Sequence, residues 1–360
     1  MAEIHEFREA ARKRQRKKTI RRIAVGVILV CLAVIIFINR QSLTPEAISN
    51  WLSASLVRST GGEGFPMSLP SGEIISIDGA GNDIVVTNQT NVYFYSQKGR
   101  EIRSIQHSKK VVQTKTAGKN ALVYSVGGNE ASVETATKTA ASVETVKPIM
   151  SGAVSKNGWF ALATESDVYT SELKVYDKNG NEVFKWIPSG GVISSISISP
   201  DGNFVSASTL YSSGGELQSG IYLFSKSKSE ALISQQLSDE IVVAMYCQKN
   251  VVYAITDKQI IKVEPDGITA KYSFGEKELI NHSLQGDNFV LVFRDVNDPG
   301  KSVLTVLTEK LELKSTAGVN APVITSSVSG ENVYLLSSTA VLEYEIDTAL
   351  KSGEAALSQD

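Results

Sequence analysis

Residues 193–208 are the most informative stretch of the chain and read ISSISISPDGNFVSAS. The first seven residues alternate apolar and serine side chains, which is the two-residue period of a β-strand. Pro200-Asp201-Gly202-Asn203 then has the composition of a turn, and residues 204–208 return as a second strand. The stretch therefore predicts an antiparallel β-hairpin.

The same unit, a tight turn followed by a short apolar strand, recurs seven times at a spacing of roughly forty residues. The turns and strands are Gly81-Asn82 before 84–86, Lys119-Asn120 before 121–124, Asn157-Gly158 before 160–163, Asp201-Gly202 before 204–207, Lys249-Asn250 before 251–254, Asp287-Asn288 before 289–292, and Glu331-Asn332 before 333–336. Repeats of this length built from strands and turns are typical of a β-propeller, so the sequence predicts an all-β fold with seven blades. A solenoid is the alternative architecture, but the variable repeat lengths and hairpin-type turns argue against it.

The spacing of the predicted third strands supports the same number of blades. Third strands are predicted to end at residues 95, 176, 224, 263, 307 and 344. The gap between the first two is twice the period, so one blade has a weak third strand near Ser132-Val133, in a segment rich in Ala, Thr, Val and Glu.

Ring closure is predicted from the two ends of the repeat region. The last blade has clear second and third strands at 333–337 and 340–346, whereas 349–360 makes a poor fourth strand. Residues 65–69 (FPMSL) lie upstream of the first blade without a partner. We therefore expect 65–69 to complete the last blade, with the propeller at 65–350 and a carboxy-terminal tail at 351–360.

The net charge of −2 hides a division of charge along the chain. Residues 1–22 hold nine Lys/Arg against three Glu, a net +6, so the rest carries −8. A basic tail on an acidic body argues against nucleic-acid binding by the body. Cys31 and Cys247 lie far apart in sequence and predict no disulfide.

Residues 23–38, from Ile23 to Ile38, carry no charge, and twelve of the sixteen are Ile, Val, Leu or Phe. They favour bilayer insertion by about 5 kcal/mol and predict one transmembrane helix at 23–39. The positive-inside rule places the tail, 1–22, in the cytoplasm and the body outside. The alternatives are a cleaved signal peptide, which lacks a small-x-small site after Ile38, a lipoprotein, and a buried soluble helix. The tail either sets topology alone or also attracts anionic lipid.

A short amphipathic helix is predicted in the connector, residues 40–64. Thr44-Pro45-Glu46 has the composition of a helix start, and Ile48, Trp51, Leu52 and Leu56 then form one apolar stripe. The stripe either lies in the membrane interface or packs on the propeller, and the scarcity of basic residues favours packing. Gly61 to Gly64 (GGEG) ends the helix.

Several motifs resemble those of known propellers. The Ser199-to-Asn203 turn is similar to that of many bacterial propellers. Tyr176-Asp177-Lys178-Asn179-Gly180 with Trp186 resembles the third-to-fourth strand turn of quinoprotein-like and, more distantly, WD40-like propellers. Only one blade carries the Trp, so the resemblance implies no quinone site. The whole layout resembles an uncharacterised family of single-span bacterial propellers, a domain of unknown function. That family implies a location in the cell envelope of Gram-positive bacteria and supplies no catalytic residues.

No catalytic, cofactor or metal site is predicted. His5, His107 and His282 are widely separated, and no His/Cys/Asp cluster has metal-ligand spacing. There is no nucleophile elbow and no phosphate loop. The segment Asp177 to Asn181 is interpreted as a hairpin turn rather than a calcium loop.

Three loops between second and third strands are predicted to be long, at 165–171, 209–220 and 294–301. They open on one face, so Tyr169, Tyr211 and Arg294 are the candidate binding residues. The alternative is that insertions are simply tolerated there.

Two functions follow. The first is a non-enzymatic, membrane-anchored extracytoplasmic module of the bacterial cell envelope that binds a protein or a glycan. The alternative is an envelope enzyme of hydrolase or lyase type with a dispersed site. Carboxylates or a His–acid pair at the channel mouth would favour the enzyme, and hydroxyls, tyrosine and backbone groups would favour the binding module.

Overall fold

The computed structural model describes residues 70–228 and 230–356, and every regular element in them is a β-strand. The predicted tail, transmembrane helix, connector helix and closing segment 65–69 lie outside the described residues. Within the described part, no helix has the length and hydropathy needed to span a bilayer.

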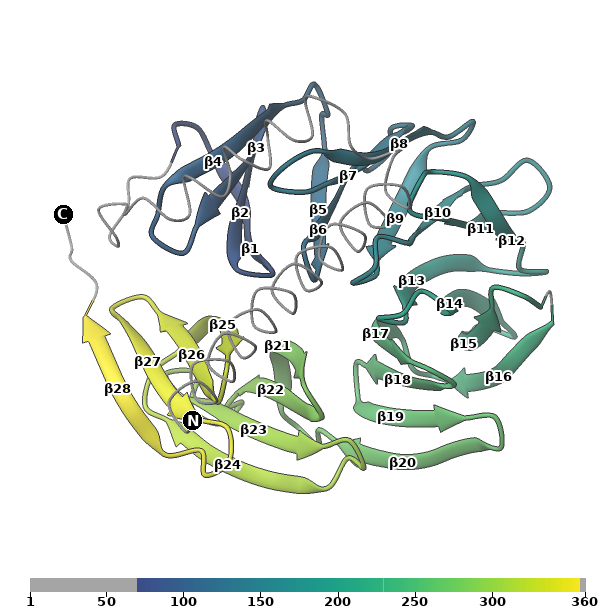
Figure 1. The fold of residues 1–360 in the computed structure, drawn as a ribbon. Helices are drawn as coiled ribbons and strands as arrows, with labels where there is room; N and C mark the ends of the chain where they lie inside the picture. The colour runs from purple at the N-terminus through teal and green to yellow at the C-terminus, as the bar shows by residue number, and fades with distance from the viewer. Residues whose placement is uncertain (1–69, 229, 357–360) are drawn as a thin grey trace, which may run out of the picture.

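Seven antiparallel sheets of four consecutive strands surround a central axis (Figure 1), so the predicted seven-bladed propeller is confirmed. Blades 1 to 4 comprise β1 (Ile74–Ala80), β2 (Asp83–Asn88), β3 (Asn91–Ser96) and β4 (Glu101–Gln106); β5 (Val112–Ala117), β6 (Asn120–Ser125), β7 (Glu130–Glu134) and β8 (Thr139–Glu144); β9 (Ile149–Val154), β10 (Phe160–Glu165), β11 (Ser171–Tyr176) and β12 (Glu182–Trp186); and β13 (Val192–Ile198), β14 (Phe204–Ser213), β15 (Glu216–Ser225) and β16 (Ala231–Ser238). Blades 5 to 7 comprise β17 (Val242–Gln248), β18 (Val251–Thr256), β19 (Gln259–Glu264) and β20 (Gly267–Ser273); β21 (Glu278–Gln285), β22 (Asn288–Arg294), β23 (Ser302–Thr308) and β24 (Leu313–Val319); and β25 (Val323–Ser329), β26 (Asn332–Ser337), β27 (Ala340–Glu345) and β28 (Lys351–Ala356).

The turn in the opening stretch shows why the sequence folds as it does. Gly202 has a φ of 69°, which suits glycine best. The Asp201 carboxylate accepts hydrogen bonds from the Ser199 hydroxyl (2.6 Å) and the Asn203 backbone N–H (3.1 Å). These contacts fix the reversal between β13 and β14.

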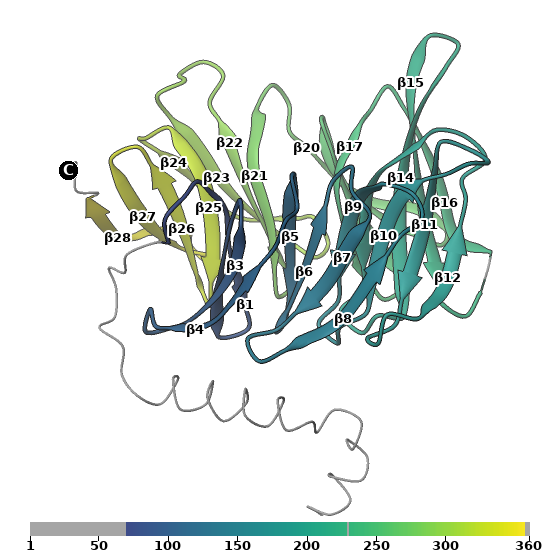
Figure 2. The ribbon, with the colours of Figure 1, turned by 90° about the horizontal axis from the view of Figure 1, so that it is seen from above.

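The molecule has two different faces, visible edge-on in Figure 2. The turn face carries the short turns between first and second strands and between third and fourth strands. The long-loop face carries the loops between second and third strands and the connections between blades, and the β14–β15 hairpin projects from it.

Two predictions about the chain path are wrong. Residues 351–356 are not a tail, because β28 pairs with β27 and completes blade 7 without residues 65–69. Residues 209–220 are not a loop, because β14 and β15 stay paired as far as Ser213 and Glu216. Gly214 and Gly215 close this hairpin with φ values of 62° and 87°, the geometry of a two-residue turn.

The core consists of six apolar clusters, each between two neighbouring blades. They join blades 1 and 2, 2 and 3, 3 and 4, 4 and 5, 5 and 6, and 6 and 7. Ring stability therefore comes mainly from contacts between neighbouring units, as in other repeat folds.

Candidate binding face

The three predicted binding residues lie on the long-loop face but come from three different blades. Tyr169 is in the loop after β10 and is 50% exposed. Tyr211 is on β14, where its hydroxyl donates to Gln236 Oε1 at 2.9 Å. Arg294 ends β22 and pairs with Glu278 at 2.9 Å. None of the three lines a cavity described below, so the structure does not gather them into one site.

A ring of bulged residues surrounds the channel mouth on the same face. Six of the seven innermost strands carry a β-bulge at their second or third residue, which inserts one extra side chain. Five of these residues are apolar and are called the apolar collar: Ile75, Met150, Val243, Ile280 and Ile324. Ile75, Val243 and Ile324 are 40%, 52% and 60% exposed. The bulge leaves Ile75, Val243 and Ile324 exposed at the channel mouth, whereas Met150 and Ile280 pack partly buried against the clusters between blades 3 and 4 and between blades 6 and 7.

Other exposed apolar side chains lie on the same face. They are Val111, Val146, Val168, Tyr169, Leu217 and Val296. The turns of the opposite face contribute only Leu350 among the described residues, while Val183, Ile268 and Leu313 lie on outer strands. An apolar patch on one face of a soluble domain commonly marks an interaction surface.

The channel behind the collar has a cavity of about 620 Å³ that both polar and apolar residues line. Ser151, Ser194, Ser195 and Ser197 contribute hydroxyls. Lys115, Tyr246 and His282 also line it. Burial raises the pKa of the one channel-side carboxyl on β1, Asp78.

His282 is held as a neutral ring. Its Nδ1 lies 2.9 Å from the Tyr246 hydroxyl. Burial, with the positive charge of Lys115 as the second cause, lowers the pKa of His282 to about 4. Among the described residues of the channel, no carboxylate is hydrogen-bonded to His282. The polar groups that line the channel are mainly hydroxyls of serine and tyrosine.

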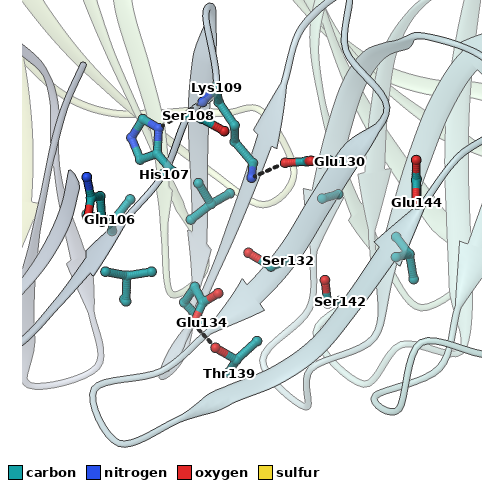
Figure 3. Close-up of a pocket in the computed structure, with 15 residues that line it drawn as sticks. Gln106, His107, Ser108, Lys109, Glu130, Ser132, Glu134, Thr139, Ser142 and Glu144 are labelled. Carbon is teal, nitrogen blue, oxygen red and sulfur yellow. Dashed lines mark hydrogen bonds and ion pairs between the residues drawn. The ribbon is translucent and has the colours of Figure 1, made fainter. Parts of the chain in front are cut away.

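A groove of about 790 Å³ separates the outer halves of blades 1 and 2 (Figure 3). On the side facing blade 1, blade 2 carries Ser132 paired with Ser142. The equivalent place in blades 4, 5 and 7 holds Tyr222, Ile261 and Leu342. The groove exists because two serines occupy positions that larger side chains fill elsewhere.

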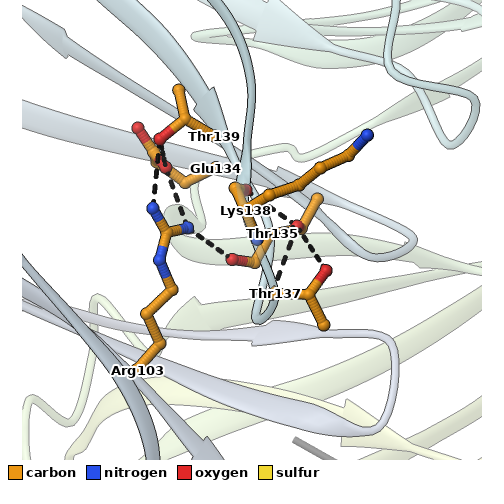
Figure 4. Close-up of polar contacts among 6 residues, drawn as sticks. All are labelled: Arg103, Glu134, Thr135, Thr137, Lys138 and Thr139. Atoms are coloured by element: carbon orange, nitrogen blue, oxygen red, sulfur yellow. Dashed lines mark hydrogen bonds and ion pairs between the residues drawn. The ribbon is translucent and has the colours of Figure 1, made fainter. Parts of the chain in front are cut away.

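Charged contacts close the groove at the turn face (Figure 4). Arg103 of blade 1 donates to Glu134 Oε2 at 3.1 Å and to the Thr135 carbonyl at 2.8 Å. Thr139 donates to the same carboxylate oxygen at 2.7 Å and accepts from Arg103 Nη2 at 3.0 Å. Because Glu134 is buried, this network of charge-assisted hydrogen bonds joins the two blades in a low-dielectric setting.

The groove opens at the long-loop face. Lys109 and Glu130 pair there at 3.3 Å, and Glu144 is exposed. His107 Nδ1 accepts from the Lys109 N–H at 3.3 Å, which leaves Nε2–H to donate to the Asn88 carbonyl at 3.2 Å. Both nitrogens are used and burial lowers the pKa of His107, so this ring has a structural role.

Sequence reasoning missed both the collar and the groove. The sequence predicts a weak third strand near Ser132-Val133, in a segment rich in Ala, Thr, Val and Glu, but small side chains such as Ser132 also signal unfilled space. The collar has no sequence signal of its own, because a bulge depends on strand register.

No cluster of metal-ligand side chains occurs in the part of the chain that the structure describes. A model of a family of unknown function, DUF5711, matches residues 71–353. The chain belongs to this family. The match covers all seven blades, so the family is defined by the propeller. No curated protein matches the chain.

Solved structures show the same fold at low sequence identity. The designed Ika8 protein has 12% identity and a TM-score of 0.55, over 80% of this chain and 85% of that one. Apo AztD from Citrobacter koseri has 12% identity and a TM-score of 0.56, over 81% and 88%. The Dos1 propeller has 11% identity and a TM-score of 0.57, over 77% and 78%. These likenesses extend to the fold alone.

Proposed function

We propose that this chain is a non-enzymatic binding module of the cell envelope that engages a protein partner through its long-loop face. The observation that carries the proposal is the apolar collar, which places exposed aliphatic side chains around one end of the ring. Protein interfaces have a water-excluding apolar centre with a polar rim. The collar would form the centre, and the open end of the groove between blades 1 and 2 would lie on the rim.

The proposal includes a single membrane span at residues 23–39 and an extracytoplasmic propeller. Its support is the uncharged run of residues 23–38 after a tail of net charge +6. Protease added to protoplasts should remove residues beyond about 60 and leave the tail protected. A propeller that is protected until lysis would reverse the topology.

Binding is tested by site-specific photocrosslinking on intact cells. A photoreactive residue replaces Val243 in the collar, and the matched control replaces Val183, which is 40% exposed on the outer strand β12. We expect one discrete protein adduct from position 243, lost when Ile324→Ser is added, and no such adduct from position 183. Equal labelling from both positions would show that the collar is not the interface.

A further inference from the structure

Among the described residues, one junction of the ring has no apolar cluster, unlike the other six. This junction, between blade 7 and blade 1, is called the seam, and Figure 1 shows the two blades side by side in yellow and in purple-blue. None of the six clusters contains residues of both blades. The seam is where the first and last blades of the chain meet.

Both blades nevertheless present apolar side chains to the seam. On blade 1, Ile77 is 56% exposed and Tyr93 is half-buried. On blade 7, Tyr334, Leu336 and Val341 are half-buried, because the cluster shared with blade 6 uses the opposite face of β26 and β27. Successive side chains of a strand point to opposite faces of the sheet. The pairing of β26 with β27 therefore places Tyr334, Leu336 and Val341 on the face toward the seam.

Two further apolar side chains of blade 1 are buried outside the six clusters. Val86 and Tyr95 are 1% and 6% exposed, yet they are the only buried apolar residues of the described chain that belong to none of the six clusters. Val86 faces the seam, because its neighbour Thr87 points the other way and bonds Thr114 of blade 2 at 2.8 Å.

The chain enters blade 1 on the seam side. Asn88, which lies on the same side of β2 as Val86, donates its Nδ2–H to the Ser71 carbonyl at 2.9 Å. Ser71 therefore lies on the seam side of blade 1, just after the segment 65–69 in the chain.

We propose that residues 65–69 lie in the seam and that Phe65, Met67 and Leu69 pack between blades 1 and 7. These three alternate with Pro66 and Ser68, so an extended segment would direct them to one side. Pro66 favours an extended backbone at Phe65. Five extended residues span roughly 17 Å, about the length of the strands they would cover.

This role differs from that of a fourth strand in blade 7, a position that β28 holds. In the proposed role, residues 65–69 stabilise the junction between the first and last blades and also connect the propeller to the amino-terminal part of the chain. The inference is independent of what the long-loop face binds.

Disulfide trapping in the full-length protein in detergent tests the contact. With Cys31→Ser as background and the buried Cys247 retained, Met67→Cys is combined with Val341→Cys in blade 7. The matched control combines Met67→Cys with Val183→Cys on blade 3. Mild oxidation should give an intramolecular disulfide in the first pair only. Disulfides between two molecules would assign the seam to a second copy, and no disulfide from positions 65, 67 or 69 would overturn the proposal.

A second measurement does not depend on cysteine geometry. Phe65→Ser, Met67→Ser and Leu69→Ser together should lower the thermal midpoint of the full-length protein by at least about 5 °C. The control replaces three exposed loop residues, Val168, Leu217 and Val296, by Ser and should leave the midpoint unchanged. Equal midpoints for the two triple variants would contradict seam packing.

Discussion

His282 should make the propeller acid-sensitive. Its half-buried ring lies on β21 against Tyr246, and desolvation lowers its pKa in the folded protein to about 4 from the ordinary 6.5. The unfolded chain therefore binds a proton at higher pH than the folded chain does. Stability contributed by the neutral ring is present at neutral pH and is lost as the pH falls through the unfolded value toward the folded one.

The size of the effect follows from the shift. Two and a half pKa units correspond to about 3 kcal/mol, of which about 2 kcal/mol is lost by roughly pH 5. Urea unfolding at neutral pH and near pH 5 measures it by tryptophan fluorescence. His282→Gln keeps a hydrogen-bonding partner for Tyr246 without titrating, so this variant should lose about 2 kcal/mol less than the parent over the same pH interval.

Other groups also titrate between neutral pH and pH 5. The prediction therefore concerns the difference between the parent and the variant in the free energy of unfolding that each loses. His107→Gln is the matched control, because His107 sits in the open groove mouth and should leave most of the pH dependence in place. If the parent and His282→Gln lose equal stability on acidification, the ring is either hydrated or already charged in the folded protein. The account of the channel as a site with a half-buried, neutral histidine would then be wrong.

Three further predictions concern blades 1, 2 and 7. Ser132→Ile should leave the thermal midpoint unchanged or raise it, since Ile261 occupies the equivalent place in blade 5; a clear fall by differential scanning fluorimetry would mean that the groove is not open space. Glu134→Ala should cost about 3 kcal/mol in urea unfolding, because it leaves Arg103 without its buried partner, whereas a cost under about 1 kcal/mol would mean that the network does not join the blades. Deleting residues 351–360 should lower the midpoint by removing β28, whereas deleting 357–360 should not, and equal midpoints would restore the tail interpretation.

The repeat could be predicted from sequence because each hairpin is specified locally. Asp201 and Gly202 give the turn, and alternation on either side gives the strands. The extended β14–β15 hairpin was missed although its signal was present. Gly214-Gly215 supplies two positive φ values, the geometry of a tight turn rather than of a loop.

The last strand could not be predicted, because nothing in its side chains requires burial. Lys351 and Glu354 are exposed on β28, and the strand is held by backbone pairing with β27. A strand at the outer edge of a blade needs no apolar alternation, so hydrophobic pattern underestimates it.

The features that suggest function are the places where side chains of the blades are left unpacked. The turn motif that the blades share forms the turn face, and its residues stabilise the hairpins. Blade 2 differs in Ser132 and Ser142, whose small side chains leave the groove open. The innermost strands depart from a regular ladder at their second or third residues, which turns Ile75, Val243 and Ile324 outward.

A position that every blade fills in the same way is explained by packing. Where one blade leaves space unfilled, or where a bulge exposes an apolar side chain, the protein loses the stabilisation that buried apolar area would give. Such a position needs an explanation other than packing. The collar and the open mouth of the groove both have this character, and both lie on the face from which the β14–β15 hairpin projects. Unpacked side chains and unfilled space, rather than the regular turns, therefore direct the search for a partner to the long-loop face.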